Sequence, residues 1–248
     1  MVKRFILALL FAPAAVHAAG GDIRLDRASI DSGDVLSIQR GARVFVNYCL
    51  NCHSAAAMRY NRLTDLGLTE RQIKDNLLFA GEKVGDPMQI AAGKKDQQEW
   101  FGVAPPDLSV IARSRGVDWL YTYMRSFYRD PARVTGWNNL AFPNVGMPHV
   151  LWQLQGTQVL KSEIEEHGGR EVEHRKLVLE SPGILSPLEY DKLARDLVNY
   201  LSYMGEPAQA RRVQIGIVVL LFLSLLLVLS WLLKTEYWKD VHRPSTPR

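Results

Sequence analysis

The two cysteines of this 248-residue chain stand three positions apart, at Cys49 and Cys52, and His53 follows the second one directly. Two thiols at this spacing can form a disulfide, a redox-active pair, half of a zinc site or the attachment point of a haem. A redox-active pair normally precedes a helix in a βαβ unit, which the flanking sequence lacks, and zinc needs two more ligands although there is no other cysteine. The adjacent histidine favours haem, because in C-x-x-C-H the thiols bond the two vinyl groups and the imidazole reaches the iron. One motif predicts one covalently attached haem c, with His53 as an iron ligand.

A short helix over residues 38 to 48 is expected to position this motif. Val44, Phe45 and Tyr48 lie on one side of such a helix. Gly41 stands one turn before Phe45, where the missing side chain allows another helix to approach closely.

Residues 186 to 205 are the expected partner of that helix. Ser186 is a candidate N-cap with Pro187 at the first helical position, and Glu189 completes a capping box. Its apolar residues have helical spacing: Leu193, Leu197, Tyr200, Leu201 and Met204. Two helices packed across the haem motif predict a mainly α fold, a cytochrome c-like haem domain with loop elaborations that wrap the haem.

The remaining exported chain gives weaker signals. Helical patterns occur in "TERQIKDNLLFA", which starts at Thr69, and in "GVDWLYTYMRSFY", which begins near Asp118 and continues through Phe127. The Gly- and Pro-rich segments 81–109 and 131–148 are interpreted as loops. The polar segment 156–183 alternates loosely, so we interpret it as a surface elaboration with a β-hairpin as the candidate form.

The first 18 residues have the layout of a secretory signal peptide. Lys3 and Arg4 precede an apolar run, and small residues lead to a cleavage site after Ala18. The alternative, a short N-terminal anchor, is disfavoured because the run is too short to cross ~30 Å of hydrocarbon. The sequence therefore predicts that the chain after Ala18 is exported.

An uncharged run from residue 213 to 233 predicts a transmembrane helix. At 1.5 Å per residue the run is roughly 31 Å long, which matches the apolar thickness of a bilayer. Arg211 and Arg212 precede it, and Trp231 and Trp238 mark the far interface. The predicted organisation is a signal peptide (1–18), an exported haem domain (19–209), a transmembrane anchor (210–234) and a cytoplasmic tail (235–248).

The formal net charge of +4 does not describe the exported part. The signal peptide carries two positive charges, and in the tail four basic residues outnumber two acidic ones. The exported domain is therefore close to neutral, which excludes a nucleic-acid-binding protein and suits a basic protein partner.

Three stretches resemble the cytochrome c1 family, the haem subunits of the cytochrome bc1 complex (quinol–cytochrome c oxidoreductase). They are the haem motif at 49–53, "APPDLSVIARSRG" at 104–116 and "FPNVGMPHVLW" at 142–152. The C-terminal anchor and short basic tail complete the layout. The haem motif alone is common to c-type cytochromes, whereas its combination with the other two stretches and the anchor is specific.

The resemblance implies a one-electron carrier that accepts electrons from a Rieske iron–sulfur protein and passes them to a cytochrome c. Cytochrome b and the Rieske protein would be partner subunits, and quinol oxidation would belong to them, so no catalytic residue is predicted here. The short chain and plain signal peptide are typical of the proteobacterial type. This would place the anchor in the bacterial inner membrane and the haem domain in the periplasm.

A sixth ligand of the iron must come from elsewhere in the chain. The candidates are the methionines and histidines beyond the signal peptide: Met58, Met88, Met124, Met147, Met204, His149, His167 and His174. Met147 is favoured because its loop is bracketed by prolines, has a glycine directly before it and follows His53 by 94 residues. The family motif also places its axial methionine here. Met88 and His149 remain alternatives.

Two further site residues follow from the resemblance. Pro106 would line the haem on the His53 side, where a backbone carbonyl can orient the imidazole. Arg115 matches the family arginine that meets a haem propionate, a pairing that suits a guanidinium, and Arg113 is the competing candidate. Trp119 stands where the family often has a tyrosine that contacts the other propionate, so no role is assigned to it.

Two other functions remain open. One is a membrane-anchored c-type cytochrome subunit of a terminal oxidase or nitric oxide reductase, although those typically carry the anchor at the N-terminus. The other is a haem enzyme or gas sensor, which would leave the sixth position of the iron vacant or labile, whereas an electron carrier fills it.

Overall fold

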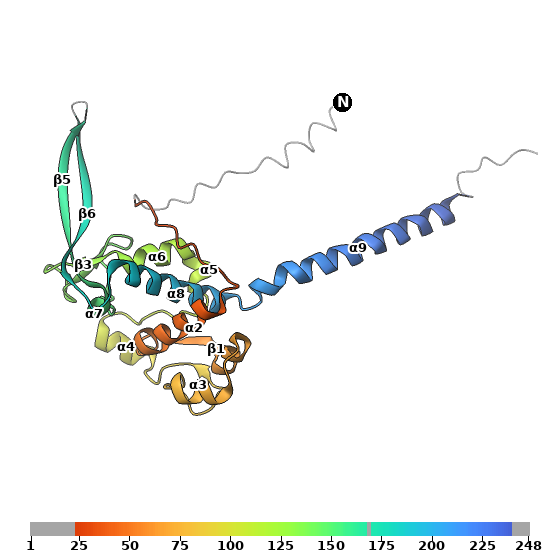
Figure 1. Cartoon of the computed structure of the whole chain (residues 1–248), viewed down its shortest axis with the longest axis horizontal. Helices are drawn as coiled ribbons and strands as arrows, with labels where there is room; N and C mark the ends of the chain where they lie inside the picture. The colour runs from red at the N-terminus through yellow and green to blue at the C-terminus, as the bar shows by residue number, and fades with distance from the viewer. Residues whose placement is uncertain (1–22, 168–169, 240–248) are drawn as a thin grey trace, which may run out of the picture.

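The computed structural model describes residues 23–167 and 170–239, so the predicted signal peptide lies outside the described residues. Short helices gather into one domain, from which a hairpin and a long C-terminal helix project in different directions (Figure 1). The helical elements are α2 (Val35–Val44), η1 (Phe45–Cys49), η2 (Tyr60–Leu66), α3 (Glu70–Asn76), α4 (Lys94–Phe101), α5 (Ile111–Arg115), α6 (Val117–Arg125), α7 (Trp152–Gln155), α8 (Pro187–Gly205) and α9 (Gln209–Trp238). The strands are β1 (Ala55–Arg59), β2 (Pro87–Met88), β3 (Phe127–Arg129), β4 (Trp137–Asn139), β5 (Gly156–His167) and β6 (Arg170–Pro182), paired antiparallel as β1–β2, β3–β4 and β5–β6. The predicted mainly α fold is confirmed.

The centre of the domain is the crossing of α2 and α8. A Cβ at Gly41 would lie 2.0 Å from the backbone oxygen of Asp196 and 2.7 Å from Cβ of Tyr200, so only glycine permits this approach. Directly after α2, the rings of Phe45 and Tyr200 lie 5.4 Å apart. The expected partner of the motif helix, and the reason for its glycine, are both confirmed.

A buried carboxylate fixes how the two helices meet. Asp196 accepts hydrogen bonds from Arg40 Nε at 2.6 Å and from Ser37 Oγ at 2.7 Å. Asn199 Nδ2 donates to Ser37 Oγ at 3.0 Å and to the carbonyl of Asp31 at 2.8 Å. Because a buried charge is costly unless it is paired and hydrogen-bonded, any other register of α2 on α8 would be penalised.

The helix starts predicted at Ser186 and Thr69 are present, and each has a capping box. At α8, Ser186 Oγ accepts from the amide of Glu189, and the amide of Ser186 donates to Glu189 Oε2 at 2.9 Å. Thr69 and Gln72 form the same reciprocal pair at the start of α3. These helix ends are encoded locally, which is why the sequence pattern located them.

Three expectations need correction. The segment 81–109 is not a continuous loop, because α4 forms inside it and stops where Gly102 adopts a left-handed conformation with φ of 74°. The helix begun near Asp118 ends at Arg125, and Phe127 instead pairs with Asn139 in the β3–β4 ladder. That ladder also places β4 within the other segment interpreted as a loop.

The hairpin of β5 and β6 confirms the interpretation of the polar segment. Its register begins with Gly156 opposite Pro182, and it extends well beyond the helical domain (Figure 1). A two-stranded ribbon is marginal alone, so its base must be held by the domain. Gln158 attaches the base of the hairpin to the domain, because its Nε2 donates to the carbonyls of Arg125 and Phe127, each at 2.9 Å.

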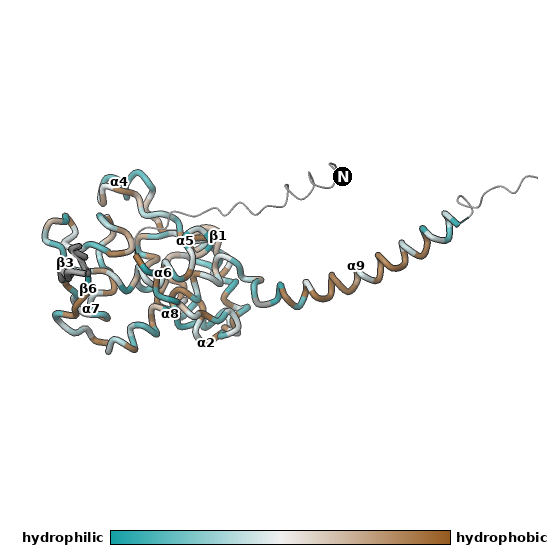
Figure 2. Tube along the Cα trace, turned by 90° about the horizontal axis from the view of Figure 1, so that it is seen from above, coloured by the Kyte–Doolittle hydropathy of each residue, from teal (hydrophilic) through white to brown (hydrophobic). Residues whose placement is uncertain are grey.

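Helix α9 leaves the domain and is apolar along most of its length (Figure 2). Within the described part of the chain, Arg211–Trp238 is the one stretch of helix long and apolar enough to cross a membrane. The helix starts at Gln209 and continues four residues beyond the predicted end of the anchor at residue 234.

Candidate haem site

The C-x-x-C-H motif follows α2 through a widened turn. Residues Phe45–Cys49 form a π-helical segment, a geometry that often occurs at functional sites. The amides of Cys52 and His53 both donate to the carbonyl of Cys49, at 3.1 and 2.9 Å. The two cysteines are free thiols, Cys49 buried and Cys52 half-buried. The turn therefore brings both thiols and the imidazole onto one short stretch of backbone.

The surroundings of Cys49 disfavour redox chemistry at the cysteine pair. Burial raises the pKa of Cys49 to about 12, and the nearby Cys52 adds to the shift. A redox-active pair needs the opposite, a thiol whose pKa is lowered so that the thiolate forms. Among residues 23–167 and 170–239, no group of three or more His, Cys, Asp and Glu side chains lies close enough to hold a metal ion.

The imidazole of His53 is already oriented for a metal. Its Nδ1 lies 2.8 Å from the carbonyl oxygen of Pro106. Because a carbonyl can only accept, Nδ1 carries the hydrogen and Nε2 keeps its lone pair. Burial lowers the pKa of His53, opposed by the Pro106 contact and by the nearby Asp107. The ring is thus held as the neutral tautomer that ligates iron through Nε2.

The segment after Pro106 is joined to the segment after His53 by three further hydrogen bonds. The amide of Leu108 donates to the carbonyl of Ser54 at 2.8 Å. The amide of Ala56 donates to Asp107 Oδ2 at 2.8 Å, and that of Ala57 to Ser109 Oγ at 3.0 Å. These bonds explain the run PPDLS as a support for the histidine. The resemblance indicated Pro106, whereas no pattern in the sequence indicated Asp107 and Ser109.

Two asparagines of β4 anchor the loop that leads to Met147. Asn139 Oδ1 accepts from the amides of Ala141 and Phe142, at 2.9 and 3.1 Å. Asn138 Oδ1 accepts from the amide of Asn144 at 2.8 Å. Asn138 and Asn139 are themselves buried, so the start of the loop is fixed from inside the domain. No sequence motif indicated that Asn138 and Asn139 would anchor this loop.

Met147 is half-buried and has an aromatic neighbour from α6. The hydroxyl of Tyr123 lies 3.4 Å from the sulfur of Met147. The ring of Tyr123 stacks on Trp119, with centroids 5.0 Å apart and 10° between the planes. The guanidinium of Arg115 lies over the other end of this group, 5.1 Å from the Trp119 centroid. Arg115, Trp119 and Tyr123 thus form a continuous row beside the Met147 loop.

The two competing arginines lie in different places. Arg115 is exposed and also lies 5.8 Å from the ring of Phe142, at the start of the Met147 loop. Arg113 instead approaches Glu206 at 3.5 Å, beyond the end of α8. Only Arg115 of this pair is therefore in contact with the predicted ligand loop.

The other candidate methionines and the alternative histidine are packed into the domain. Met58, Met88, Met124 and Met204 are all at most 6% exposed. His149 is 1% exposed and stacks on Phe127, with ring centroids 4.8 Å apart and 5° between the planes. His167 and His174 lie in the hairpin strands β5 and β6. Among the candidate methionines, Met147 is therefore the one that is only half-buried.

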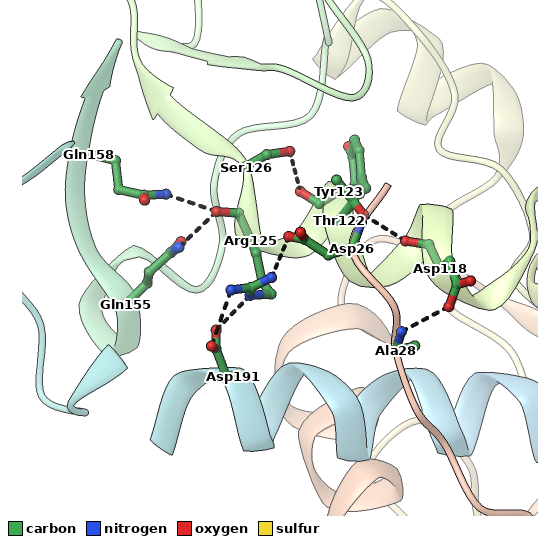
Figure 3. A network of polar contacts seen from close by, with 10 residues as sticks. All are labelled: Asp26, Ala28, Asp118, Thr122, Tyr123, Arg125, Ser126, Gln155, Gln158 and Asp191. Atoms are coloured by element: carbon green, nitrogen blue, oxygen red, sulfur yellow. Dashed lines mark hydrogen bonds and ion pairs between the residues drawn. The ribbon is translucent and has the colours of Figure 1, made fainter. Parts of the chain in front are cut away.

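A polar network ties the end of α6 to its surroundings. The carbonyl of Arg125 accepts from Gln155 and Gln158, at 3.0 and 2.9 Å (Figure 3). The guanidinium of the same residue pairs with Asp26 and Asp191 (Figure 3). The helix that carries Tyr123 is therefore fixed at its C-terminal end by the N-terminal segment, α8 and the base of the hairpin.

The residues present fit a haem. His53 offers one oriented nitrogen, Met147 offers a half-buried thioether, and two free thiols lie beside the histidine. Large apolar side chains are exposed on the segments that flank these ligands: Trp100, Phe101, Val103, Val110 and Phe142. Covering these apolar side chains with an apolar macrocycle is more favourable than leaving them exposed to water, while the polar propionates can remain in contact with water.

Comparison with known proteins assigns the family. The model of the cytochrome c1 family matches residues 27–157 and 185–241, which is most of the chain. The chain belongs to the cytochrome c1 family. The predicted family and fold are thereby confirmed, and so is the haem c cofactor.

Three similar proteins align over most of their own length and most of this chain. Cytochrome c1 of Allochromatium vinosum is 50% identical over 244 residues, covering 97% of this chain and 100% of the relative. A Nitrosomonas europaea protein named ammonia monooxygenase gamma subunit is 51% identical over 242 residues, covering 98% and 99%. Cytochrome c1 of Rhodospirillum rubrum is 27% identical over 247 residues, covering 84% and 83%.

Membership of the cytochrome c1 family defines the protein's class. It is a haem-carrying electron-transport subunit of the cytochrome bc1 complex, anchored in a membrane. Helix α9 has the length and apolarity that such an anchor requires. The family match omits residues 158–184, which coincide with nearly all of the β5–β6 hairpin, so the hairpin lies outside the part recognised as common to the family.

Proposed function

We propose that this subunit relays single electrons from a Rieske iron–sulfur protein to a cytochrome c. The cytochrome c1 match over both the haem motif and the Met147 loop carries this proposal. Cytochrome b and the Rieske protein are its partner subunits in the complex. Quinol oxidation takes place on those partners, and this chain contributes no general acid, base or nucleophile.

The haem-binding residues are assigned from their positions. Cys49 and Cys52 would form the thioethers, and His53 and Met147 would ligate the iron. The oriented Nε2 of His53 and the half-buried position of Met147 in its loop support this pair. When bound, the haem supplies one-electron oxidation and reduction, and a thioether ligand favours the ferrous state.

Two residues complete the pocket. Pro106 holds the His53 ring through its carbonyl, at 2.8 Å from Nδ1. Arg115 binds a propionate, a role supported by its place beside Trp119 and the Met147 loop. A guanidinium in that position adds positive charge near the iron and neutralises one carboxylate.

The haem domain lies on the exported side of the bacterial inner membrane, the periplasm. This follows from the signal peptide predicted at residues 1–18 and from the helix that follows the domain. A chain shortened after Pro207 and exported with its signal should be soluble and contain haem, because the described core ends with α8. Loss of haem from that fragment would show that the boundary is misplaced.

Purification of the membrane complex tests the partners. Mild detergent extraction followed by mass spectrometry should recover a cytochrome b and a Rieske protein with this chain. Recovery of a copper oxidase or a nitric oxide reductase instead would favour the alternative that the sequence left open. Recovery of ammonia monooxygenase subunits, which the name of the Nitrosomonas relative suggests, would also overturn the proposal.

Mass spectrometry of the mature chain tests the attachment. One haem should be bound through both thiols, and Cys49→Ala or Cys52→Ala should prevent its stable attachment. His53→Ala should leave a haem with damaged ligation and a lowered yield. A Cys49–Cys52 disulfide in the mature protein would contradict the assignment.

A further inference from the structure

We propose that Tyr123 is a positioning residue for Met147, and that its hydroxyl raises the reduction potential of the site by hydrogen bonding to the thioether sulfur. This inference rests on the assignment of Met147 as the axial ligand. It adds a residue that tunes the ligand, in a helix that carries no haem motif.

The contact itself has the right chemistry. Tyr123 Oη lies 3.4 Å from Met147 Sδ, which is a normal distance for a hydrogen bond to sulfur. A thioether sulfur has two lone pairs, so it can ligate iron with one and accept from the hydroxyl with the other. A tyrosine hydroxyl is protonated near neutral pH, so it acts as the donor.

The ring of Tyr123 is held in place by two aromatic neighbours. Trp119 stacks on one face at 5.0 Å, and Phe127 meets the ring edge-on, also at 5.0 Å with 69° between the planes. These contacts do not involve the hydroxyl. A substitution that removes only the oxygen should therefore leave the ring where it is.

One asparagine fixes the helix and the ligand loop together. Asn139 Nδ2 donates to the carbonyl of Tyr123 at 2.7 Å, while its Oδ1 accepts from the amides of Ala141 and Phe142. The distance between the Tyr123 hydroxyl and Met147 is thus set by the fold rather than by mobile side chains. Such preorganisation makes a weak hydrogen bond effective.

The direction of the effect follows from electrostatics. The positive end of the O–H dipole points at the sulfur, and the ferric state places one more positive charge beside that sulfur than the ferrous state does. In a site of low dielectric this dipole opposes oxidation. Removal of the hydroxyl should therefore lower the midpoint potential.

The chain contains a matched control. Tyr200 Oη lies 3.2 Å from Met88 Sδ, a contact of the same kind between two buried residues of the core. Tyr200→Phe removes the same group from the same type of acceptor. Because Met88 is not assigned to the iron, this variant should leave the potential unchanged.

The experiment uses the full chain in its membrane complex, with redox titration and absorption spectroscopy. Tyr123→Phe should keep the Met-to-ferric-iron charge-transfer band and lower the equilibrium constant for reduction by about two- to tenfold, the range expected for one hydrogen bond. Tyr200→Phe should match the unmodified protein in both measurements. Replacing Tyr123 with 3,5-difluorotyrosine, a stronger donor on the same ring, should raise the potential.

Two outcomes separate this inference from the assignment on which it rests. An unchanged or raised potential in Tyr123→Phe, in a protein that has the charge-transfer band, overturns the role of Tyr123 alone. A band that survives Met147→Leu overturns the ligand assignment. If Tyr123→Phe does not accumulate, a potential that stays constant or falls with 3,5-difluorotyrosine overturns the inference instead.

Discussion

Met88 and Met147 make the same contact in different surroundings. A tyrosine hydroxyl lies 3.2 Å from the sulfur of Met88 and 3.4 Å from that of Met147. Met88 is fully buried in a short strand that pairs with β1, whereas Met147 is half-buried in a loop. Residue type and nearest neighbour therefore do not distinguish a ligand from a core residue.

The difference lies in how the chain on either side is held. Val145 and His149, two residues before and after Met147, are buried and anchor the loop. The methionine between these anchors is half-buried. Met88 has no such arrangement, because it belongs to the hydrophobic core itself. The proposed ligand is therefore the methionine whose neighbours, rather than its own side chain, are packed into the domain.

Truncating the core methionine should have the largest effect on stability. Met88→Ala is expected to cost about 2–5 kcal/mol, since a fully buried side chain leaves a cavity. Met147→Ala should cost much less stability but remove the charge-transfer band. Denaturant unfolding and visible spectra of the two variants measure both effects. If the band were lost only in Met88→Ala, Met88 would be the iron ligand and Met147 would not.

A side chain added at the crossing of α2 and α8 should destabilise the core that contains Met88, and not the Met147 loop. In Gly41→Ala the new methyl group meets the Asp196 carbonyl at 2.0 Å and Cβ of Tyr200 at 2.7 Å. We expect a loss of about 3 kcal/mol, at the upper end for overpacking. Gly85→Ala is the control, because no atom lies within 4 Å of its added Cβ. Equal unfolding midpoints for the two variants would show that the crossing is not tight.

Loosening the anchor of the ligand loop should have a smaller effect. Asn139→Ala removes the acceptor for two loop amides and the donor to the Tyr123 carbonyl, and is expected to cost about 1–3 kcal/mol. The charge-transfer band should also fade at a lower temperature than in the unmodified protein. In Asn139→Asp, which keeps the acceptor oxygen, the band should persist to a higher temperature than in the alanine variant. A band equally stable in all three proteins would argue against the anchor.

The smallest effect is expected at the exposed arginine. Arg115→Gln should lower the equilibrium constant for reduction by about fivefold or less, because exposed charges interact weakly. Arg113→Gln, whose side chain faces Glu206, should have no effect. Redox titration of the two variants decides between them. A shift in Arg113→Gln alone would transfer the propionate role to that residue.

The elements that the sequence predicted correctly are those with local signals. The capping box at Ser186, the helix start at Thr69 and the glycine at position 41 each depend on a few neighbouring residues. Helix α4 was missed because its residues are almost all exposed, with only Gln97 buried, so no apolar stripe marks it. The end of α6 was placed too late because pairing with Asn139 draws Phe127 into a strand, and this partner lies outside the helical pattern.

The site also combines residues that the sequence predicted with residues that it did not. The positions of His53 and Met147 followed from a motif and from a resemblance. The supports of these residues did not, because they are single hydrogen bonds between distant segments. The hydrogen bond between Asp107 and Ala56 joins residues 51 positions apart, and the one between Asn139 and Tyr123 joins residues 16 positions apart. Such contacts leave no period or spacing in the sequence, so only the folded chain reveals them.

The central claim is that Met147, and not Met88, ligates the iron opposite His53. Its most direct test is the Met-to-ferric-iron charge-transfer band, recorded together with the midpoint potential in Met147→Leu and Met88→Leu. Axial ligands set haem potentials over a range of about 0.8 V, so loss of the thioether should produce a sharp fall. The account predicts that Met147→Leu loses the band and the high potential, while Met88→Leu keeps both. A Met147→Leu protein that retained the band and the potential would contradict it.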